Sequence, residues 1–467
     1  MTDKRVKDIQ ELITKLNIKD GSTLSFHHHL RNGDGVLNMV MHEVFKTNVK
    51  NIKIAPSSLF PVHKDIVPYI EDGRITSIET SYINGEVAKA VSHGKLKKGI
   101  RMHTHGGRAR AIIGSELLID VAFIALSCAD IEGSGNGIYG KSAFGPVGYA
   151  IADMKYAKKV VVITDNLTDD VIVKEIDGKY VDYVLVLDSI GDQKNIVSGT
   201  TQVTKDPVGL KIARDTANIL DTLGVIKSDF SMQTGAGGIS LAVADEVYKI
   251  MREKNIKAHL ISGGITSYFV NMLEQGFVDY LYDVQAFDLE AVRSYKENPN
   301  HKAMSASKYA NPFDDPIVNK LDFVILGATE IDLNFNVNVT TDSHGMLIGG
   351  SGGHADAAHG AKITVITTQM MKSRMPIIKE NVNVITTPGK DIDILVTERG
   401  IAVNPHRNDI IEKLKGKIKL YTIEELMAIC YQYTGKPKPQ KHSRTIIGEM
   451  IYRDGSVIDK IYKVEEI

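Results

Sequence analysis

Cysteine is scarce in this chain of 467 residues, which holds only Cys128 and Cys430, both in apolar segments. Two isolated thiols argue against a disulfide framework and indicate a reducing compartment. Long apolar runs are also missing: none approaches the roughly 18 residues of a membrane-spanning helix, and the N-terminus lacks the apolar core of a signal peptide. We therefore expect a cytoplasmic protein that has no membrane partner.

Neither sign of charge dominates, since 56 Lys and Arg residues stand against 57 Asp and Glu residues and leave a net charge of −1. This balance excludes bulk attraction to a polyanion, so nucleic acid is not an expected partner. With 43% hydrophobic and 24% charged residues, the composition is typical of a globular protein. At about 100–200 residues per domain, the length suggests two to four domains.

The chain contains a long internal repeat. Three segments recur in the same order at nearly one offset: 26–44 with 230–247, 120–136 with 322–338, and 157–164 with 361–368. The period is far too long for a solenoid repeat. The repeat predicts two related domains, residues 1–205 and 206–467, joined by the polar stretch Ser189–Pro207.

Both halves are predicted to be α/β with mostly parallel sheets. Short β-branched runs are apolar at consecutive positions, which is typical of strands covered on both faces. Helical patterns lie between them, the first along residues 6–16 with Gly21 past its end, another along 422–435, and a hairpin is expected around Asp454-Gly455. The expected strands are 52–55, 121–126, 160–164, 183–187, 324–326, 364–367 and 394–397.

Two glycine-rich loops are the sharpest motifs. Gly349–Asp356 (GGSGGHAD) begins with five small residues, so a ligand can approach the backbone and free amides can hold an anion or an oxyanion. Gln233–Gly238 (QTGAGG) lies between a predicted strand and a helix, where helix N-termini attract phosphate and carboxylate groups. Its spacing matches neither the dinucleotide nor the P-loop fingerprint. Either loop could instead be a tight turn before a helix.

Histidine and arginine are concentrated in the first half. His27, His28 and His29 precede Arg31, and a second group comprises Arg101, His103, His105, Arg108 and Arg110. No HExxH motif or cysteine pair accompanies them, and neighbouring strand residues alternate faces, so no metal site is predicted. Because arginine pairs with carboxylates, a site for a polycarboxylate is the functional interpretation. The alternative is a set of solvated or structurally satisfied side chains.

Six motifs, in this order along the chain, resemble the alpha chain of citrate lyase: FHHHLRNGD at 26–34, HTHGGR at 103–108, FSMQTGAGG at 230–238, SGGIT at 262–266, GGSGGHAD at 349–356 and GIAVNP at 400–405. The similarity runs over nearly the whole chain. That family belongs to the coenzyme A transferase superfamily, whose members have two related α/β domains. The internal repeat agrees with this resemblance.

The resemblance implies a citrate CoA-transferase that exchanges the acetyl group of acetyl-ACP, or of acetyl-CoA, for citrate and releases acetate. The implied partners are citrate, the thioester, and the beta and gamma chains of citrate lyase, with assembly as a homo-oligomer. The gamma chain is the acyl carrier, and its phosphoribosyl-dephospho-CoA arm carries the acyl group. The alpha chain itself would hold no permanent cofactor.

A departure from the superfamily bears on the mechanism. Many members use a strand-end glutamate that becomes a glutamyl thioester, but here the strand 257–262 runs into Gly263-Gly264. The resemblance implies that a citrate carboxylate attacks the acetyl thioester and that the thiolate then attacks the mixed anhydride. The protein would supply positioning and oxyanion stabilisation. Glu330 and Glu398 stay open as alternative nucleophiles.

The resemblance and the motifs together give three sets of expected site residues. The catalytic set comprises Gly237, Gly238, Gly352 and Gly353. The citrate set comprises His27, His28, Arg31, His103, His105 and Arg108. The set for the CoA or carrier arm comprises Gly235, Ala236, Gly263, Gly264, Gly350, Ser351, His354 and Asp356. Two rival functions are a general acyl-CoA transferase or thioesterase of the same fold, and a non-catalytic scaffold that binds a carboxylate.

Overall fold

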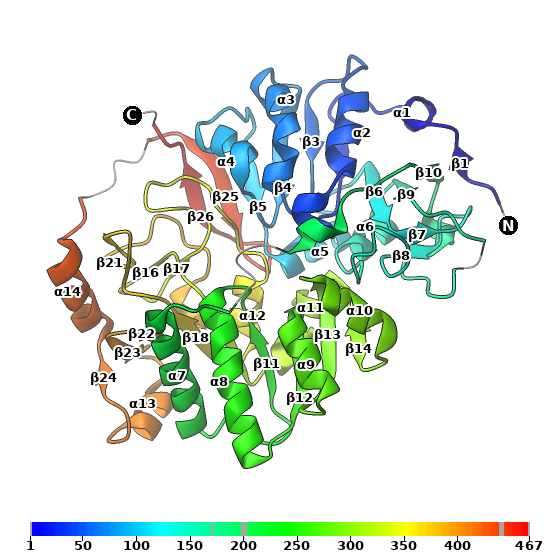
Figure 1. Cartoon of the computed structure of the whole chain (residues 1–467). Coiled ribbons are helices and arrows are strands. Elements are labelled where there is room, and N and C mark those ends of the chain that lie inside the picture. The colour runs from blue at the N-terminus through cyan, green and yellow to red at the C-terminus, as the bar shows by residue number, and fades with distance from the viewer. Residues whose placement is uncertain (1, 170, 198–202, 439–442, 466–467) are drawn as a thin grey trace.

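Two large sheets form the framework of the computed structural model, which describes residues 2–169, 171–197, 203–438 and 443–465 (Figure 1). The first sheet has the strand order β1-β10-β9-β6-β2-β3-β4-β5-β25-β26, and only its last pair is antiparallel. Its strands are β1 (Arg5–Val6), β2 (Thr23–Ser25), β3 (Ile52–Ile54), β4 (Ile75–Thr80), β5 (Ile100–Met102), β6 (Val121–Leu126), β9 (Lys159–Thr164), β10 (Tyr183–Val186), β25 (Ile446–Ile451) and β26 (Val457–Tyr462).

The second sheet has the order β14-β13-β12-β11-β15-β18-β22-β23-β24, and its antiparallel pair is β22 with β23. Its strands are β11 (Ser231–Thr234), β12 (Ala258–Ile265), β13 (Val278–Ala286), β14 (His301–Ala303), β15 (Phe323–Leu326), β18 (Ile363–Thr367), β22 (Ile394–Thr397), β23 (Gly400–Val403) and β24 (Leu420–Tyr421). The prediction of α/β halves with mostly parallel sheets is confirmed, because the apolar runs are strands with both faces covered.

Helices flank both sheets. Those around the first sheet are α1 (Ile9–Leu16), α2 (Val36–Val44), α3 (Val67–Glu71), α4 (Gly85–Ser92), α5 (His105–Ile113) and α6 (Ala150–Tyr156). Those of the second half are α7 (Pro207–Thr222), α8 (Gly238–Lys254), α9 (Ser267–Glu274), α10 (Leu289–Glu297), α11 (Ala306–Ala310), α12 (His354–Gly360), α13 (Asn408–Leu414) and α14 (Ile423–Thr434). Small sheets add β7 (Cys128–Ala129) with β8 (Gly135–Asn136), β16 (Glu330–Asp332) with β17 (Val337–Asn338) and β21 (Ile378–Lys379), and β19 (Met371–Lys372) with β20 (Met375–Pro376).

The two halves share one topology. The strand order β10-β9-β6-β2-β3-β4-β5 in the first sheet corresponds to β22-β18-β15-β11-β12-β13-β14 in the second. The repeated aspartates make the same turn: Asp130 Oδ1 accepts from the amides of residues 132 and 134, and Asp332 Oδ1 from those of 334 and 336, at 2.9–3.0 Å. The internal repeat read from the sequence is therefore a repeat of structure.

The expected C-terminal hairpin is present as β25 and β26, but it belongs to the first sheet, where β25 pairs in parallel with β5 (Figure 1). The last segment of the chain thus crosses back from the second half to the first. The division into 1–205 and 206–467 stays a prediction, with this hairpin as an exchanged element. Part of the expected linker is packed, since Ile190 and Ile196 are buried, and its residues 198–202 lie outside the described part.

The first helix differs from its prediction at both ends. Val6 lies in β1, and the helix begins at Ile9, because Asp8 caps it by accepting a hydrogen bond from the Glu11 amide at 2.9 Å. At the other end Asn17 adopts a left-handed conformation (φ 50°) and ends the helix before Gly21. The expected strands and the helix at 422–435 are confirmed to within a residue or two.

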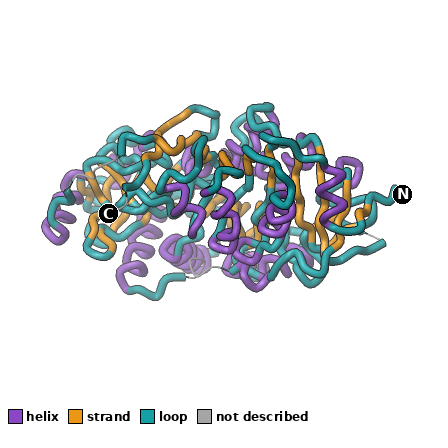
Figure 2. Tube along the Cα trace, turned by 90° about the horizontal axis from the view of Figure 1, so that it is seen from above, coloured by secondary structure: helices purple, strands orange, loops and turns teal. Residues whose placement is uncertain are grey.

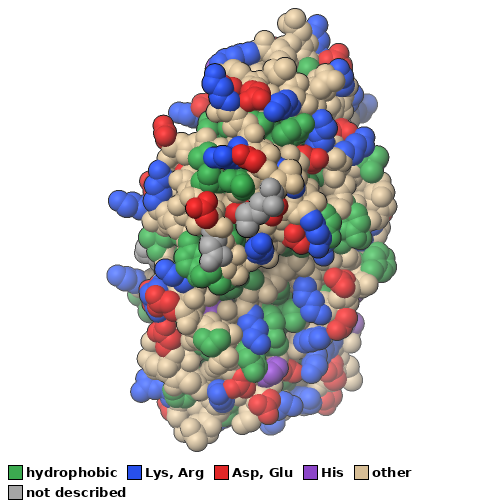
Figure 3. Space-filling view, turned by 90° about the vertical axis from the view of Figure 1, so that its right-hand side faces the viewer, with side chains coloured by type: hydrophobic (Ala, Val, Ile, Leu, Met, Phe, Trp, Pro, Cys, Tyr) green, Lys and Arg blue, Asp and Glu red, His purple; other side chains and the backbone are tan. Residues whose placement is uncertain are grey.

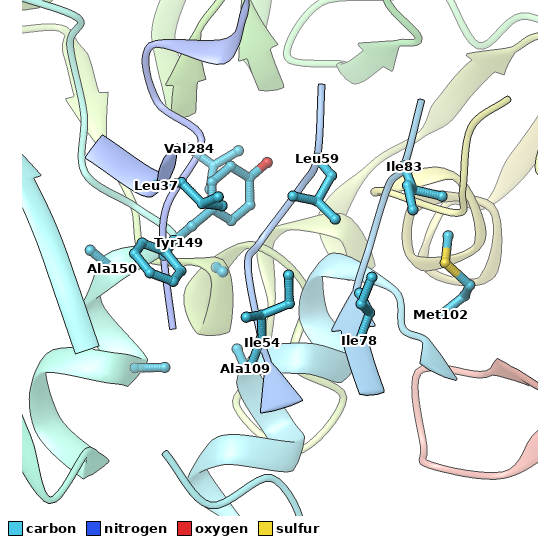
Figure 4. Close-up of a cluster of buried hydrophobic side chains, with 14 of the residues drawn as sticks. Leu37, Ile54, Leu59, Ile78, Ile83, Met102, Ala109, Tyr149, Ala150 and Val284 are labelled. Atoms are coloured by element: carbon cyan, nitrogen blue, oxygen red, sulfur yellow. The ribbon is translucent and has the colours of Figure 1, made fainter. Parts of the chain in front are cut away.

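The core is shared between the halves. One continuous cluster of buried apolar side chains contains first-half residues together with Val284, Met304 and Tyr309 of the second half. Figure 4 shows Tyr149 beside Val284 in this cluster. A separate cluster lies between the second sheet and its helices α7 to α9. The halves therefore bury apolar surface against each other, which fixes the loops between them.

The exterior fits the balanced composition. Lys and Arg side chains are interspersed with Asp and Glu over the face in Figure 3. Seen from above, the molecule is elongated, with the first and last described residues toward opposite ends (Figure 2). Among the described residues, no helix combines the length and apolar character needed to cross a membrane.

Candidate active site

The loops at the carboxyl ends of the strands meet between the two halves. Residues 104 and 352 form a parallel bridge, and the His105 amide donates to the Gly352 carbonyl at 2.8 Å. Gln285 Nε2 of the second half donates to the His28 carbonyl at 3.0 Å. Ligand sites in parallel α/β sheets lie at this end of the strands, so this junction is the candidate site.

A wall of stacked rings forms the first-half side of the junction. The His28 ring lies 4.7 Å from the Tyr149 ring, and the His105 ring lies 4.5 Å from the same tyrosine. His29 stacks on Phe144 at 5.3 Å, and His28 Nδ1 is 2.6 Å from Ser57 Oγ. The predicted residues His28 and His105 are therefore brought together, although they come from different loops.

Burial keeps these imidazoles neutral. It lowers the pKa of His28 and His29 well below the ordinary value, that of His27 to about 4 and that of His105 to about 3. Among the described residues, no hydrogen-bond partner faces either nitrogen of His27, Nε2 of His29 or Nδ1 of His105. Neutral rings offer single N–H donors, so positive charge for an anion must come from elsewhere.

Arg31 supplies that charge. Its guanidinium lies 5.6 Å from the centre of the Phe60 ring and 4.7 Å from that of Phe287, which belongs to the second half. Burial lowers its pKa, yet a guanidinium stays protonated at neutral pH. Its backbone is left-handed (φ 53°), an uncommon conformation for a residue other than glycine. Arg31 is thus placed between the halves by a strained turn and two aromatic rings.

Two residues predicted for citrate have partners inside the first half. His103 Nε2 is 2.8 Å from Glu79, which also pairs with Lys53 at 2.9 Å. Arg108 donates to both oxygens of Asp153 at 2.9 Å. Burial raises the pKa of that carboxyl, but the charge of Arg108 and the hydrogen bonds from Arg108 and Ser25 contribute to a net shift that is downward. Both side chains are therefore already engaged and do not join the ring wall.

Glycines of the loop 349–353 allow the second half to press against the first. Gly352 has φ +50°, and a Cβ there would stand 3.4 Å from His105 Nε2. A Cβ on Gly353 would stand 2.2 Å from the Tyr309 hydroxyl, and one on Gly350 would stand 2.4 Å from the Ser81 carbonyl oxygen. A side chain at Gly350 would push the halves apart, and one at Gly353 would displace Tyr309 within the second half. At Gly352 the positive φ itself favours glycine.

Three other members of the same motif hold the loop in place. Ser351 Oγ accepts from the Ala355 amide at 3.4 Å, and the His354 ring lies between Thr387 Oγ1 at 2.7 Å and the Gly327 carbonyl at 2.9 Å. Asp356 accepts from Thr104 Oγ1 and from the Gly106 amide, each at 2.8 Å. Burial lowers the pKa of His354 to about 4 and raises that of Asp356 to about 6.

The second glycine loop is more open. Gly237 is the residue before α8, no side chain caps that helix, and a Cβ at Gly237 would meet nothing within 4 Å. The first amides of a helix lack partners within it, so this end can receive an anionic or carbonyl group. Gly235, Ala236 and Gly238 lie in the same turn, where the Gly235 amide donates to the Ile325 carbonyl at 2.7 Å.

The end of β12 has no space for a nucleophilic side chain. Gly263 has φ +111° at a bulge, and a Cβ there would stand 2.9 Å from Gln233 Cδ. A Cβ on Gly264 would stand 2.3 Å from the Phe287 ring. The alternative nucleophiles are held elsewhere: Glu330 is buried and pairs with Lys379, while Glu398 accepts from the Met370 amide at 3.0 Å.

Four residues at the junction were given no role from the sequence: Tyr149, Gln233, Phe287 and Tyr309, although Gln233 opens the second glycine-rich motif. Tyr149 carries the ring between His28 and His105, and Gln233 Nε2 donates to the Tyr309 hydroxyl at 2.8 Å. The repeat held a signal for one of them, because aligning the first residues of α6 and α12 places Tyr149 opposite Gly353. The part of the chain that is described contains no group of three His, Cys, Asp or Glu side chains able to hold a metal ion.

Comparisons with known proteins agree with this geometry. The family model described as citrate lyase, alpha subunit, matches residues 2–464. The citrate lyase alpha chain of Haemophilus influenzae is 43% identical over 99% of this chain and 93% of its own length. That of Escherichia coli strain K12 is 41% identical over 99% of this chain and 91% of its own length.

Solved structures give the same result. The putative alpha subunit of citrate lyase from Streptococcus mutans, in complex with citrate, superposes with a TM-score of 0.97 at 42% identity and covers 100% of this chain and 92% of its own. The malonate decarboxylase alpha subunit from Acinetobacter baumannii has a TM-score of 0.68 at 17% identity over 94% of this chain and 87% of its own, which shows a shared fold alone. The chain belongs to the citrate lyase alpha subunit family, the citrate CoA-transferase part of citrate lyase.

Proposed function

We propose that the junction between the halves binds citrate and catalyses its exchange with the acetyl group of a thioester. The arrangement of His28, His105 and Arg31 opposite Gly352 and Gly353 carries this proposal. Arg31 meets the carboxylates with charge, and the neutral imidazoles donate single hydrogen bonds. The related Streptococcus mutans chain was solved with citrate, which supports citrate as the ligand. His103 and Arg108 would support this surface from within the first half, since they are paired with Glu79 and Asp153.

The reaction we propose needs no protein nucleophile. A citrate carboxylate oxygen bonds to the acetyl carbon, and the carbon–sulfur bond breaks to release the thiolate. The thiolate then bonds to the citryl carbonyl carbon of the mixed anhydride, and acetate leaves with the bridging oxygen. The glycines at 263 and 264 favour this route, because neither position accommodates a glutamate. The protein holds the reactants in line and stabilises each oxyanion with backbone amides.

The thioester arm would enter along the loop 235–238 and the start of α8, where amides lack helical partners. We propose that this arm is the phosphoribosyl-dephospho-CoA group of the gamma chain, with free acetyl-CoA as a substitute. The alpha chain would hold no cofactor of its own. Copies of it would form a homo-oligomer, and the beta chain would be a further partner. Both cysteines are free and buried, which supports the cytoplasm as its compartment.

One assay tests the chemistry. The purified chain is incubated with citrate and acetyl-CoA, and the thioesters are identified by mass spectrometry. Citryl-CoA and acetate are expected, and borohydride treatment should reduce no glutamyl thioester on the protein. If citryl-CoA is absent, the assay is repeated with acetyl-loaded carrier protein. A protein glutamyl thioester, or the absence of citryl product in both assays, would contradict the proposal.

A variant pair tests the position of citrate. Arg31→Met should raise the KM for citrate on the order of 10- to 100-fold, because hydrogen bonds to charged groups are among the stronger ones. Arg74→Met is the matched control, since Arg74 also lies over two aromatic rings, Phe45 at 4.9 Å and Tyr69 at 4.6 Å, outside the junction. Equal effects of the two substitutions would show that Arg31 acts through packing alone.

A further inference from the structure

A buried amide at the end of β11 has an oxygen without a partner. Gln233 is 5% exposed, and its Nε2 donates to the Tyr309 hydroxyl at 2.8 Å. Within the described residues, its Oε1 has no hydrogen-bond partner. Buried polar atoms in folded proteins are almost always paired, so an unpaired one at a candidate site points to a ligand.

This amide lies among the residues of the proposed active site. Its Cδ is 2.9 Å from the place where a Cβ of Gly263 would stand, and the hydroxyl that holds it touches Gly353. The neighbouring Gly264 packs against Phe287, the ring beneath Arg31. The amide of Gln233 therefore lies between the glycine loops and the cationic side of the junction.

The chemistry of the oxygen restricts what it can bind. An amide oxygen accepts a hydrogen bond and cannot donate one, so it repels a carboxylate. The unpaired hydroxyls nearby, those of Thr234, Ser262 and Thr266, can do both and discriminate less. At neutral pH the three carboxylates of citrate only accept, and its tertiary hydroxyl is its single donor.

We infer that Gln233 is a specificity residue whose Oε1 accepts a hydrogen bond from the tertiary hydroxyl of citrate. The inference rests on the proposed position of citrate between the halves. It gives the enzyme a means of rejecting tricarboxylates that lack the hydroxyl, because the buried oxygen then stays unpaired. Tyr309 acts as a positioning residue, since its hydroxyl fixes the direction of the amide.

Tricarballylate, which is citrate with hydrogen in place of the hydroxyl, is the direct probe. Calorimetric titration of the full chain gives a Kd for each tricarboxylate. The native chain should bind citrate at least about 100-fold more tightly than tricarballylate. Gln233→Met keeps the length of the side chain and removes the amide, so the ratio should fall to roughly 10 or less. Tyr309→Phe keeps the amide of Gln233 but removes the hydroxyl that fixes its direction, so an intermediate ratio of the two Kd values is expected.

Gln285→Met is the matched control. It removes another buried glutamine, whose amide donates to the His28 carbonyl, and it should leave the ratio near the native value. Circular dichroism of each variant checks that the fold is kept. If Gln233→Met does not fold, the Tyr309→Phe ratio carries the test.

Two results would overturn the inference: the native chain binds both tricarboxylates equally well, or folded Gln233→Met keeps the native ratio. If the kept ratio is accompanied by a raised KM for acetyl-CoA, the amide is assigned instead to an N–H of the thioester arm. Arg31→Met distinguishes this failure from a failure of the proposed function. If the substitution leaves citrate binding unchanged, the proposed position of citrate is wrong. If it weakens citrate binding, only the role of Gln233 is wrong.

Discussion

The two halves carry the same strand order but present opposite kinds of surface at the junction. The first half presents rings and a guanidinium, from His28, His105, Tyr149 and Arg31, while the second presents glycine backbone. Equivalent loops contact each other reciprocally: His105 N donates to Gly352 O at 2.8 Å, and Ala306 N donates to Gly148 O at 2.9 Å. One scaffold, used twice, thus yields one side suited to an anion and another suited to a carbonyl.

The difference lies mainly in one loop. The strand β2 begins at Thr23 and the helix after it at Val36, whereas β11 begins at Ser231 and its helix at Gly238. The connection in the first half is therefore longer, and the added residues hold the histidines and Arg31. The alignment of Phe26 with Phe230 was therefore wrong. Leu24 and Met232 are the equivalent residues, because their partners in the neighbouring strands, Val121 and Phe323, are equivalent.

Equivalent positions beneath the loops show the same contrast. Helix α5 begins at His105 and α11 at Ala306, and aligning these two starts places Arg108 opposite Tyr309. In the first half Arg108 links Ser25 to Asp153 in a buried ion pair. In the second half the corresponding hydroxyl of Tyr309 holds Gln233 and leaves its oxygen unpaired. The first network is a buried ion pair within the first half, whereas the second leaves an acceptor oxygen that the inferred ligand would pair.

The largest effect should come from breaking the buried ion pair between Arg108 and Asp153. Arg108→Met leaves Asp153 buried without its cation, and it should lower the free energy of unfolding by about 3–5 kcal/mol. Urea titration measures this change. Arg293→Met is the control, because its ion pairs lie at the surface and should contribute no more than about 1 kcal/mol. A loss below about 1 kcal/mol for Arg108 would show that the network is not structural.

Next in size is a side chain placed between the halves. Gly352→Val adds a branched residue at φ +50°, beside His105, and should lower kcat about 100- to 1000-fold while the fold is kept. Steady-state assays with citrate measure the loss. Gly416→Val carries similar backbone strain (φ +74°) with nothing within 4 Å, and its kcat should be unchanged. A fully active Gly352→Val would remove this glycine from the site.

The carboxyl of Asp356 should make the free energy of unfolding depend on pH in a way that has no counterpart in the first half. Aligning the starts of α6 and α12 places Ala152, which cannot ionise, at the equivalent position. Burial raises its pKa from 3.8 to about 6. As the pH rises from 4 toward 6, the Asp356 carboxyl ionises in the unfolded chain before it ionises in the folded one. The folded state therefore loses about 3 kcal/mol of stability in all. The unfolding free energy of the native chain relative to Asp356→Asn should fall by that amount between pH 4 and pH 7. A flat difference would mean that the folded carboxyl titrates normally.

The smallest expected effect concerns a single hydrogen bond between the halves. Gln285→Met removes the bond to the His28 carbonyl and should cost about 1 kcal/mol of stability. Urea titration again provides the measurement. A loss above about 3 kcal/mol would indicate that Gln285 has a larger part in joining the halves than its one bond to His28 suggests.

The sequence alone determined the α/β class, the repeat and most strand positions, because consecutive apolar residues and glycine turns are local signals. It also marked the loops that meet at the junction. Tertiary structure decided which side chains are available there: His103 is paired with Glu79, 24 residues away, and Arg108 with Asp153, 45 residues away. No local pattern records such pairings, since they depend on which strands become neighbours. For the same reason the sequence did not reveal the contact between Gln233 and Tyr309, which spans 76 residues.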